Sequence, residues 1–355
     1  MPKVLITPAD YDSVRTAVER VFECFPLPLA GKTVCIKPNV LRASQAHEGI
    51  VTHPAVLRAV VEKVKSLKPA DVVVGDNPGL FSYGANEESF WQTGLMEAAR
   101  GCYRNIGNDA VRVAFPAEFM PSVSISRAIH EADIVISLPK FKTHGLTVMT
   151  GAIKNSYGYL PGAQKALLHR IAGSPERFHD LVVEVFKLRV PDLFIMDAVV
   201  GMEGNGPASP DLRDIGLILA ADNAVALDAV VATMMGAAPE RLRFLQKARA
   251  DGLGDYDISK LDIRGVLKPL PDFRLPPLGG SAIQDNPAVQ EFIAERAQLR
   301  PRADADLCNA CGTCIDQCPA GALAMNDDLP LVDAERCITC FCCQEICPEK
   351  AMTLV

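Results

Sequence analysis

The chain has 355 residues, of which 49% are hydrophobic and 22% charged, and its formal net charge is −7. This composition is typical of a globular protein with about two domains. It contains neither the run of ~20 apolar residues that a membrane-spanning helix needs nor a basic region that would attract nucleic acid.

Strand and helix patterns alternate through residues 1–265, which predicts an α/β domain with flanking helices on a mostly parallel sheet. The predicted strands are residues 3–7, 33–36, 71–75, 111–114, 134–138, 193–197, 215–220 and 261–264. Helices are predicted at residues 14–25, 56–67 and 174–185, where apolar side chains recur every three or four positions. Thr52 is the expected N-cap of the second helix and Ser174 of the third. Because no secretion signal precedes the first strand, we expect a cytoplasmic protein.

The sequence changes character at residue 266. Four prolines between residues 266 and 277, followed by Gly279 and Gly280, predict a Pro-rich linker, which we place at residues 266–302. A short helix is expected within it, at residues 287–298. Residues 303–355 are predicted to form a small α+β domain at the C-terminus.

The small domain contains nine of the twelve cysteines. Eight of them form two copies of the spacing Cys-x2-Cys-x2-Cys-x3-Cys-Pro, offset by 29 residues. The segment resembles bacterial two-cluster ferredoxins, in which the cysteine before the proline binds the opposite cluster. We therefore predict two 4Fe–4S clusters. One is assigned to Cys308, Cys311, Cys314 and Cys347, and the other to Cys337, Cys340, Cys343 and Cys318.

Two alternatives for these cysteines stay open. A structural zinc site needs only four ligands in paired knuckles, and a cluster can also serve the structure alone. The ninth cysteine, Cys342, aligns with Thr313 of the first copy, so we expect it not to be a ligand. Phe341 takes the place of Gly312, so the two clusters should differ in hydrogen bonding and solvent access.

Polar turns follow several predicted strands of the larger domain. Ligands of open α/β sheets bind beyond the carboxyl ends of the strands, so these turns form the candidate site. The basic groups at residues 140–155 lie among Gly, Thr and apolar residues, which favours a site for a phosphate or carboxylate. The alternative for each turn is structural, because Asp and Asn often bond to backbone and Lys is often solvated.

The candidate residues have three roles. The cofactor- or ligand-binding candidates are Lys37, Asn39, Lys140, Lys142, Lys154, Asn155, Glu203, Gly204, Asn205 and Gly206. His144 and His53 are candidates for proton transfer. Asp76 and Glu203 are candidates for orienting a ligand or binding a metal.

Together these motifs resemble a known family. Lys37-Pro38-Asn39, Thr52-His53-Pro54, Gly75-Asp76 and the segments 139–144, 151–155 and 201–207 are similar to those of the family called domain of unknown function 362. That family is often fused to a C-terminal ferredoxin module and is found largely in anaerobes and archaea. The resemblance covers residues 3–266 and implies an architecture but no reaction. A weaker similarity, in the order of turns, helices and strands only, links such domains to the nickel-pincer lactate racemase fold and implies only an α/β body with a cleft.

Three functions fit this sequence. The first is a ferredoxin-coupled oxidoreductase, in which the clusters feed electrons to an anionic small molecule or to a further cofactor, such as a flavin or a metal, bound over the polar turns. The second is a non-catalytic electron-transfer adaptor that docks a partner enzyme. The third is a redox-neutral isomerase or lyase with a regulatory cluster. We also expect an electron donor or acceptor protein as a partner, since residues 302–355 carry nine carboxylates against three basic residues.

Overall fold

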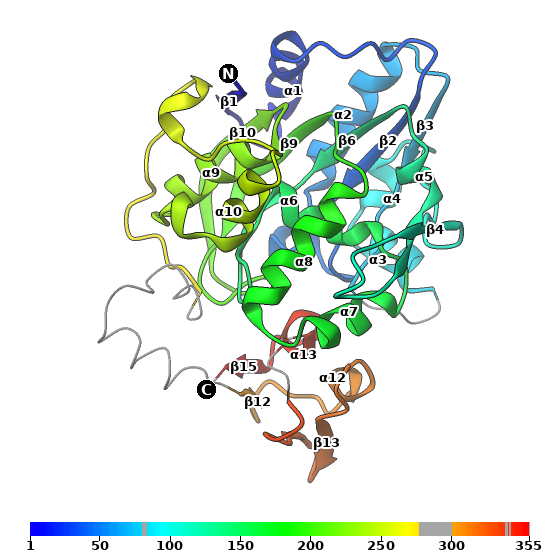
Figure 1. Cartoon of the computed structure of the whole chain (residues 1–355), viewed down its shortest axis with the longest axis vertical. Coiled ribbons are helices and arrows are strands. Elements are labelled where there is room, and N and C mark those ends of the chain that lie inside the picture. Colours follow the sequence, from blue (N-terminus) through cyan, green and yellow to red (C-terminus); the bar gives the residue numbers. More distant parts are fainter. Residues whose placement is uncertain (80–83, 277–299, 338–339, 341, 355) are drawn as a thin grey trace.

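The structure is a computed structural model that describes residues 1–79, 84–276, 300–337, 340 and 342–354. It consists of a large α/β body and a small C-terminal module beneath it (Figure 1). The body is built on a nine-stranded mixed sheet. Its strands are β1 (Lys3–Pro8), β2 (Thr33–Pro38), β3 (Asp71–Val74), β6 (Ile134–Leu138), β7 (Lys140–His144), β8 (Val148–Thr150), β9 (Leu193–Met202), β10 (Leu212–Ala221) and β11 (Asp262–Arg264).

The strand order is β11-β1-β10-β9-β6-β2-β3, with β7 and β8 attached through β9. The centre is parallel, since β2 pairs with β3 and β6, and β6 and β7 pair with β9 in the same direction. The strand β10 runs antiparallel to both β1 and β9. The predicted fold class is therefore confirmed, as a mixed sheet with flanking helices.

Two hydrophobic cores cover the two faces of the sheet. Neighbouring residues of one strand point into different cores: Cys35 belongs to one, and Val34 and Ile36 belong to the other. This alternation is what a strand buried on both faces requires. The first core packs under α6 (Ala152–Asn155), α7 (Gln164–Ala172), α8 (Pro175–Lys187), α9 (Ala224–Met234) and α10 (Arg243–Ala250). The second packs under α1 (Val14–Cys24), α2 (Pro54–Ser66), α3 (Ala85–Gln92) and α4 (Leu95–Ala98).

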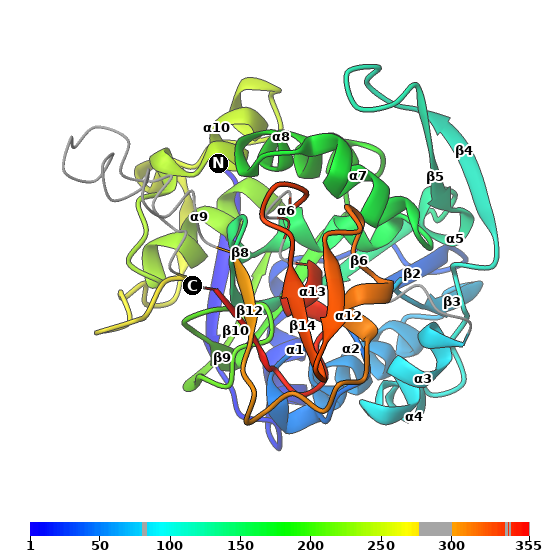
Figure 2. The ribbon, with the colours of Figure 1, turned by 90° about the horizontal axis from the view of Figure 1, so that it is seen from below.

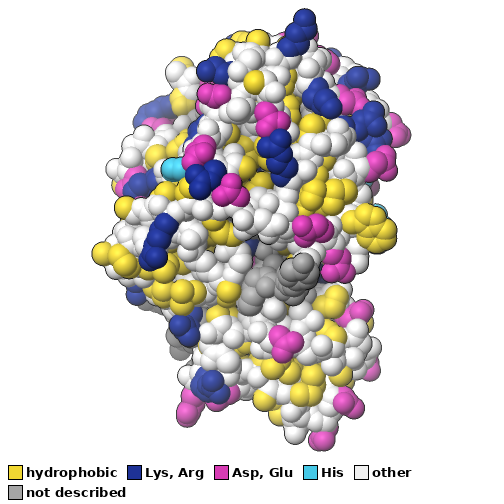
Figure 3. Space-filling view, turned by 90° about the vertical axis from the view of Figure 1, so that its right-hand side faces the viewer, with side chains coloured by type: hydrophobic (Ala, Val, Ile, Leu, Met, Phe, Trp, Pro, Cys, Tyr) yellow, Lys and Arg dark blue, Asp and Glu magenta, His cyan; other side chains and the backbone are white. Residues whose placement is uncertain are grey.

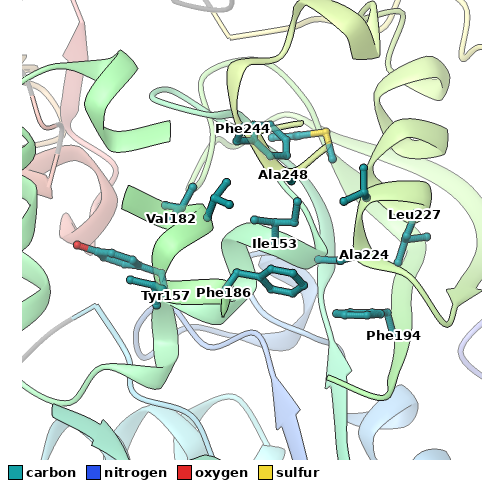
Figure 4. Close-up of a cluster of buried hydrophobic side chains, with 14 of the residues drawn as sticks. Ile153, Tyr157, Val182, Phe186, Phe194, Ala224, Leu227, Phe244 and Ala248 are labelled. Carbon is teal, nitrogen blue, oxygen red and sulfur yellow. The ribbon is translucent and has the colours of Figure 1, made fainter. Parts of the chain in front are cut away.

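The first core holds the short helix α6 in place. Figure 4 shows Ile153 of α6 among side chains of α8, α9 and α10, close to Phe186. The start of α6 is fixed by the buried Asp228 of α9, whose carboxylate accepts hydrogen bonds from the N–H groups of Ala152 and Ile153 at 2.6 and 3.0 Å. The helix therefore presents its polar residues in a fixed direction.

Several predicted elements need correction. Residues 111–114 form a strand, β4 (Ala110–Ala114), but it pairs only with β5 (Ser122–Ser126), outside the main sheet. The segment 140–144, predicted as a turn, is the buried strand β7, because it pairs with β9 despite its polar sequence. Thr52 does not cap α2. The cap is His53, whose Nδ1 accepts from the N–H of Ala55, while the Thr52 hydroxyl donates to the carbonyl of Leu138. The expected helix at residues 287–298 lies outside the described residues.

The remaining short elements connect these layers. They are α5 (Arg127–His130) and the 3₁₀ turns η1 (Ala46–Glu48), η2 (Ser156–Tyr159), η3 (Pro239–Arg241) and η4 (Ile258–Lys260). Ser174 caps α8 as predicted, since its hydroxyl accepts from the N–H of Arg177 at 3.3 Å.

The small module has an internal two-fold repeat. Its elements are β12 (Pro301–Ala303), α12 (Thr313–Asp316), β13 (Leu323–Asn326), β14 (Leu329–Val332), α13 (Cys342–Ile346) and β15 (Met352–Leu354). The first strand pairs with the last, β12 with β15, and the two middle strands form the hairpin β13–β14. In Figures 1 and 2, α13 lies on the side of the module that faces the body.

Candidate functional site

A pocket lies between the body and the module, with about 750 Å³ of empty space including its open mouth. The module contributes Cys342, Glu345 and Ile346 from α13, and Gln317. The polar and charged residues that the body contributes are Asn39, Asp76, Asn77, Lys142, His144, Thr150, Lys154, Asn155, Lys165 and His169.

A buried ion pair supports this pocket. Lys37 lies near the end of strand β2, and Asp76 follows strand β3. Because these strands pair in parallel, Lys37 Nζ and Asp76 Oδ1 lie 2.7 Å apart. Two backbone N–H groups also donate to the Asp76 carboxylate. The side-chain oxygen of Asn155 accepts from both Lys37 and Asn39. Lys37 thus already has a carboxylate partner, although the sequence suggested it as a ligand-binding residue.

Two further buried lysines are held by backbone carbonyls. Lys142 donates to the carbonyl of Ile50 at 2.6 Å, and Lys165 donates to that of Asn77 at 2.7 Å. Burial lowers the pKa of Lys142 to about 7, with a further contribution from the nearby Lys154. Burial likewise lowers the pKa of Lys165 to about 7. Both side chains are therefore only partly protonated near neutral pH, and their neutral amines gain a proton readily when a negative charge arrives.

Lys154 differs from these lysines. Its ammonium group lies 5.1 Å from the ring centre of Tyr157 and 5.6 Å from that of Phe178. Within the described part of the chain, it forms neither a hydrogen bond nor an ion pair. Burial lowers its pKa. Lys154 therefore presents an unpaired cation to the pocket.

His144 meets Glu345 of the module across the pocket, with Nε2 and Oε1 3.0 Å apart. The His144 Nδ1 accepts from the N–H groups of Leu146 and Thr147, which places the proton of the neutral ring on Nε2. Burial, together with Lys154, lowers the pKa of His144 to about 4. Burial opposes ionisation of Glu345, but His144 and Lys154 outweigh it and hold its pKa at about 2. At neutral pH the pair is a neutral imidazole beside a carboxylate.

Two candidates from the sequence lie elsewhere, in a cluster formed by Tyr11, His53, Lys140 and Asp197. Lys140 Nζ is 2.7 Å from the Asp197 carboxylate and donates to the Tyr11 hydroxyl, and the ring of His53 stacks on that of Tyr11. The pairing of β7 with β9 is irregular between Lys140 and Lys142. Regular alternation would place both lysines on one face, but the irregularity separates them, and Lys140 does not line the pocket. His53, at the start of α2, does not line it either.

The glycine-rich segment does not cradle a ligand with Glu203. The carboxylate of Glu203 pairs with Arg213 at 3.1 Å and with Arg274 at 3.0 Å, and these arginines lower its pKa against the effect of burial. The N–H of Gly204 donates to the carbonyl of Arg274. Glu203 and Gly204 therefore fasten this loop to the segment that follows β11.

Of the next two residues of this loop, Asn205 contacts the module and Gly206 packs closely against β7. The carbonyl of Asn205 accepts from the side chain of Gln344 in α13 at 3.2 Å. The N–H of Gly206 donates to Thr143 of β7, and a Cβ atom at Gly206 would lie 2.1 Å from the Thr143 carbonyl oxygen. The loop thus serves as a docking surface for the module.

The cysteines of the module line two cavities. One is bordered by Cys308, Cys311, Cys314 and Cys347, and the other by Cys318, Cys337, Cys340 and Cys343. These are the two crossed sets that the sequence suggested. The N–H groups of Ala322 and Ala351 donate to Cys318 Sγ and Cys347 Sγ at equivalent positions of the repeat. Four thiols around each hollow, with N–H donors to sulfur, fit an iron–sulfur cluster. Nowhere in the described residues do three His, Cys, Asp or Glu side chains gather as a site for a single metal ion.

Several residues of the pocket escaped sequence reasoning. Lys165 and His169 lie one turn apart on α7, and this spacing of four residues was the available signal. Tyr157, Cys342 and Glu345 also line the pocket. Glu345 belongs to the ferredoxin repeat, and its position between two cysteines gave no indication that it faces another domain.

Comparison with protein families identifies both parts. Residues 300–348 match the model of a 4Fe–4S dicluster domain. The protein is therefore an iron–sulfur protein. Residues 34–233 match the model described as a domain of unknown function (DUF362). The chain belongs to this family, as its turn motifs predicted.

Two curated relatives match different parts. A thylakoid-associated protein of Synechocystis sp. is 32% identical over 226 residues, covering 63% of this chain and 69% of the relative. A protein of Methanosarcina thermophila named "Probable ferredoxin" is 52% identical over 27 residues, covering 8% of this chain and 47% of that protein.

In the described part of this chain, no helix combines the length and the apolar character needed to cross a bilayer.

Solved structures offer distant matches. A protein from Thermotoga maritima matches with a TM-score of 0.37 and 9% identity over 55% of this chain. The lactate racemase apoprotein from Thermoanaerobacterium thermosaccharolyticum matches with a TM-score of 0.39 and 12% identity over 61% of this chain. The chain covers 52% and 53% of these two proteins, about half of each. Similarity at this level does not bear on the reaction.

Proposed function

We propose that the protein is a ferredoxin-coupled oxidoreductase with two 4Fe–4S clusters and an anionic substrate or cofactor in the pocket between body and module. One observation carries this proposal: α13 belongs to both sites. Its residues Cys342, Glu345 and Ile346 line the pocket, while Cys343 within the helix and Cys347 directly after it line the two cysteine cavities. Adjacent Cα atoms are only ~3.8 Å apart, so the two kinds of site are close neighbours.

The ligand sets follow the two cavities. Cys308, Cys311, Cys314 and Cys347 would hold one cluster, and Cys318, Cys337, Cys340 and Cys343 the other. When bound, the clusters supply single electrons, usually at low potential. Cys342 lines the pocket and borders neither cavity, which is consistent with a non-ligand.

The pocket residues bind the anion and move a proton. Lys154 offers an unpaired ammonium group, and Lys142 and Lys165 add positive charge. His144 would donate the proton on Nε2 to the reduced ligand. The N–H groups of Leu146 and Thr147 at Nδ1 hold the ring in that tautomer, and Glu345 lies beside Nε2. Asp76 fixes Lys37 and takes no direct part.

We further infer a basic protein as the external electron partner. Exposed carboxylates of the module include Asp316, Asp327 and Asp328, and exposed apolar residues lie near them at Met325 and Leu331. The lower lobe in Figure 3 shows such carboxylates around hydrophobic side chains. A partner with a basic rim would be steered toward this face at low salt. We expect the protein to meet this partner in the cytoplasm.

The proposal is tested by mixing dithionite-reduced protein, freed of excess reductant, with a panel of organic anions under anaerobic conditions. We expect at least one anion to restore the visible absorbance of the oxidised clusters, in a protein that contains about eight iron atoms. His144→Asn should abolish this reaction, because Asn keeps an acceptor near the position of Nδ1 but lacks Nε2. The matched control is His130→Asn, since His130 is exposed on α5. If every anion leaves the clusters reduced, the protein is not this oxidoreductase, and an adaptor role is favoured.

A further inference from the structure

The pocket carries more positive than negative charge. Lys142, Lys154 and Lys165 line it, whereas the carboxylate of Asp76 is already paired with Lys37. Glu345 is then the one carboxylate left to face three ammonium groups among the described lining residues. Because His144 and His169 have strongly lowered pKa values through burial, neither adds charge at neutral pH. When Lys142 and Lys165 are both protonated, as a bound anion favours, the excess is two positive charges.

Such an excess is costly when it is buried without a counter-charge. Lys142 and Lys165 partly relieve this cost by donating to backbone carbonyls. Lys154 has only the faces of Tyr157 and Phe178, which stabilise a cation far less than an anion does. The lysines of the pocket therefore lack a negatively charged partner on the side that faces its open space.

A second observation concerns His169. Its side chain is only 7% exposed and lines the pocket, and its Nδ1 has no hydrogen-bond partner. The ring is held rigidly, stacked on Phe178 at 4.2 Å and edge-on to Tyr157 at 5.2 Å. A neutral imidazole can place its proton on either nitrogen. An anionic oxygen in the pocket would select the tautomer with the proton on Nδ1.

We propose that the pocket binds a small organic dianion, a dicarboxylate or a phosphate monoester, and that Lys154 and His169 hold one of its anionic groups. This proposal rests on the anionic ligand of the proposed function and specifies its charge. The other negative charge would lie nearer Lys142 and Lys165. Dicarboxylates and phosphate monoesters both carry two negative charges, and measuring the binding of both classes shows which one the pocket prefers.

A competing explanation is that the lysines serve only the clusters. Lys154 interacts electrostatically with Cys342, whose thiol lies beside that of Cys340. Cluster thiolates carry negative charge, and nearby cations raise a cluster's reduction potential. If this were the whole purpose, removing Lys154 would shift the potential but would not change ligand binding.

The test is calorimetric binding to the oxidised, cluster-loaded protein at constant ionic strength, with acetate, malonate, succinate and methyl phosphate as probes. We expect one of the two dianion classes to bind about 10- to 100-fold more tightly than acetate, the gain of one further charge-assisted contact. Lys154→Met should remove this preference. His169→Phe, which keeps the stacking, should weaken the preferred dianion by about tenfold. Lys268→Met is the matched control, because Lys268 is exposed and lies outside the pocket.

The outcomes are separable from those of the proposed function. Equal binding of acetate and the dianions, no binding of any dianion, or a Lys154→Met variant that changes only the midpoint potential would each overturn the inference. Tight binding of a dianion, together with a panel in which every anion leaves the clusters reduced, would support the inference and refute the oxidoreductase. Reoxidation of the clusters by monoanions alone would support the oxidoreductase and refute the preference for a dianion.

Discussion

Two regions of the body are built around the same unit, a buried Lys–Asp pair with a 2.7 Å contact, yet they differ in completeness. In the cluster of Lys140 and Asp197, the Asp197 carboxylate also accepts from the backbone N–H groups of His53 and Val199. Around Lys37 and Asp76, the pocket adds an unpaired Lys154 and buried oxygens without partners. Buried polar groups are normally satisfied. A satisfied cluster is thus explained by structure, whereas the unsatisfied one is where the proposed ligand would bind.

The largest expected effect is on the satisfied cluster. Lys140→Met leaves the carboxylate of Asp197 buried without its cation, so we expect the free energy of unfolding to fall by about 3–5 kcal/mol. Urea denaturation monitored by circular dichroism measures this change. Dianion binding by the folded variant should be unaltered. A loss below about 1 kcal/mol would show that the two clusters do not differ as described.

A third buried carboxylate sharpens the comparison because it has no lysine. Asp228 accepts two N–H groups at the start of α6, and burial raises its pKa to about 7. The folded state then keeps a proton that the unfolded state loses, so stability falls as the pH rises from about 4 toward 7.

Asp228→Asn should remove this dependence. Between pH 5 and pH 7, the wild-type protein should lose roughly 2 kcal/mol more than the variant. Parallel urea titrations at the two pH values measure the difference. Identical slopes in the two proteins would mean that Asp228 is ionised throughout this range.

The smallest expected effect on stability belongs to Lys154→Met. This ammonium group has no ion pair to lose within the described residues, so we expect a change within about 1 kcal/mol, and in the stabilising direction. The same denaturation experiment compares it with Lys140→Met. A loss as large as that of Lys140→Met would reveal a structural role for Lys154.

Sequence reasoning reached the architecture more fully than the pocket. The cysteine repeat and the turn motifs led to the iron–sulfur module and the family, both of which are confirmed. Of the candidates from the sequence, Lys142, His144 and Lys154 line one pocket. Lys140 was grouped with them because a local irregularity between Lys140 and Lys142 cannot be read from residue types. His53 was grouped with them too, but its ring stacks on Tyr11 in the other cluster.

The rest of the pocket depends on contacts between distant segments. Glu345 lies 201 positions after His144 in the sequence, and only the docking of α13 brings their side chains to 3.0 Å. Lys165 and His169 look like ordinary surface residues of a helix, but α7 turns them inward. No local pattern of charge or hydrophobicity encodes these contacts.

The position of α13 has a kinetic consequence. A separate ferredoxin meets its enzyme by collision, at a rate that depends on the concentration of both proteins. Here the cysteine-bearing helix is itself a wall of the pocket. In the proposed function, delivery of electrons to the ligand is therefore a first-order event within one molecule, and its rate should not change on dilution.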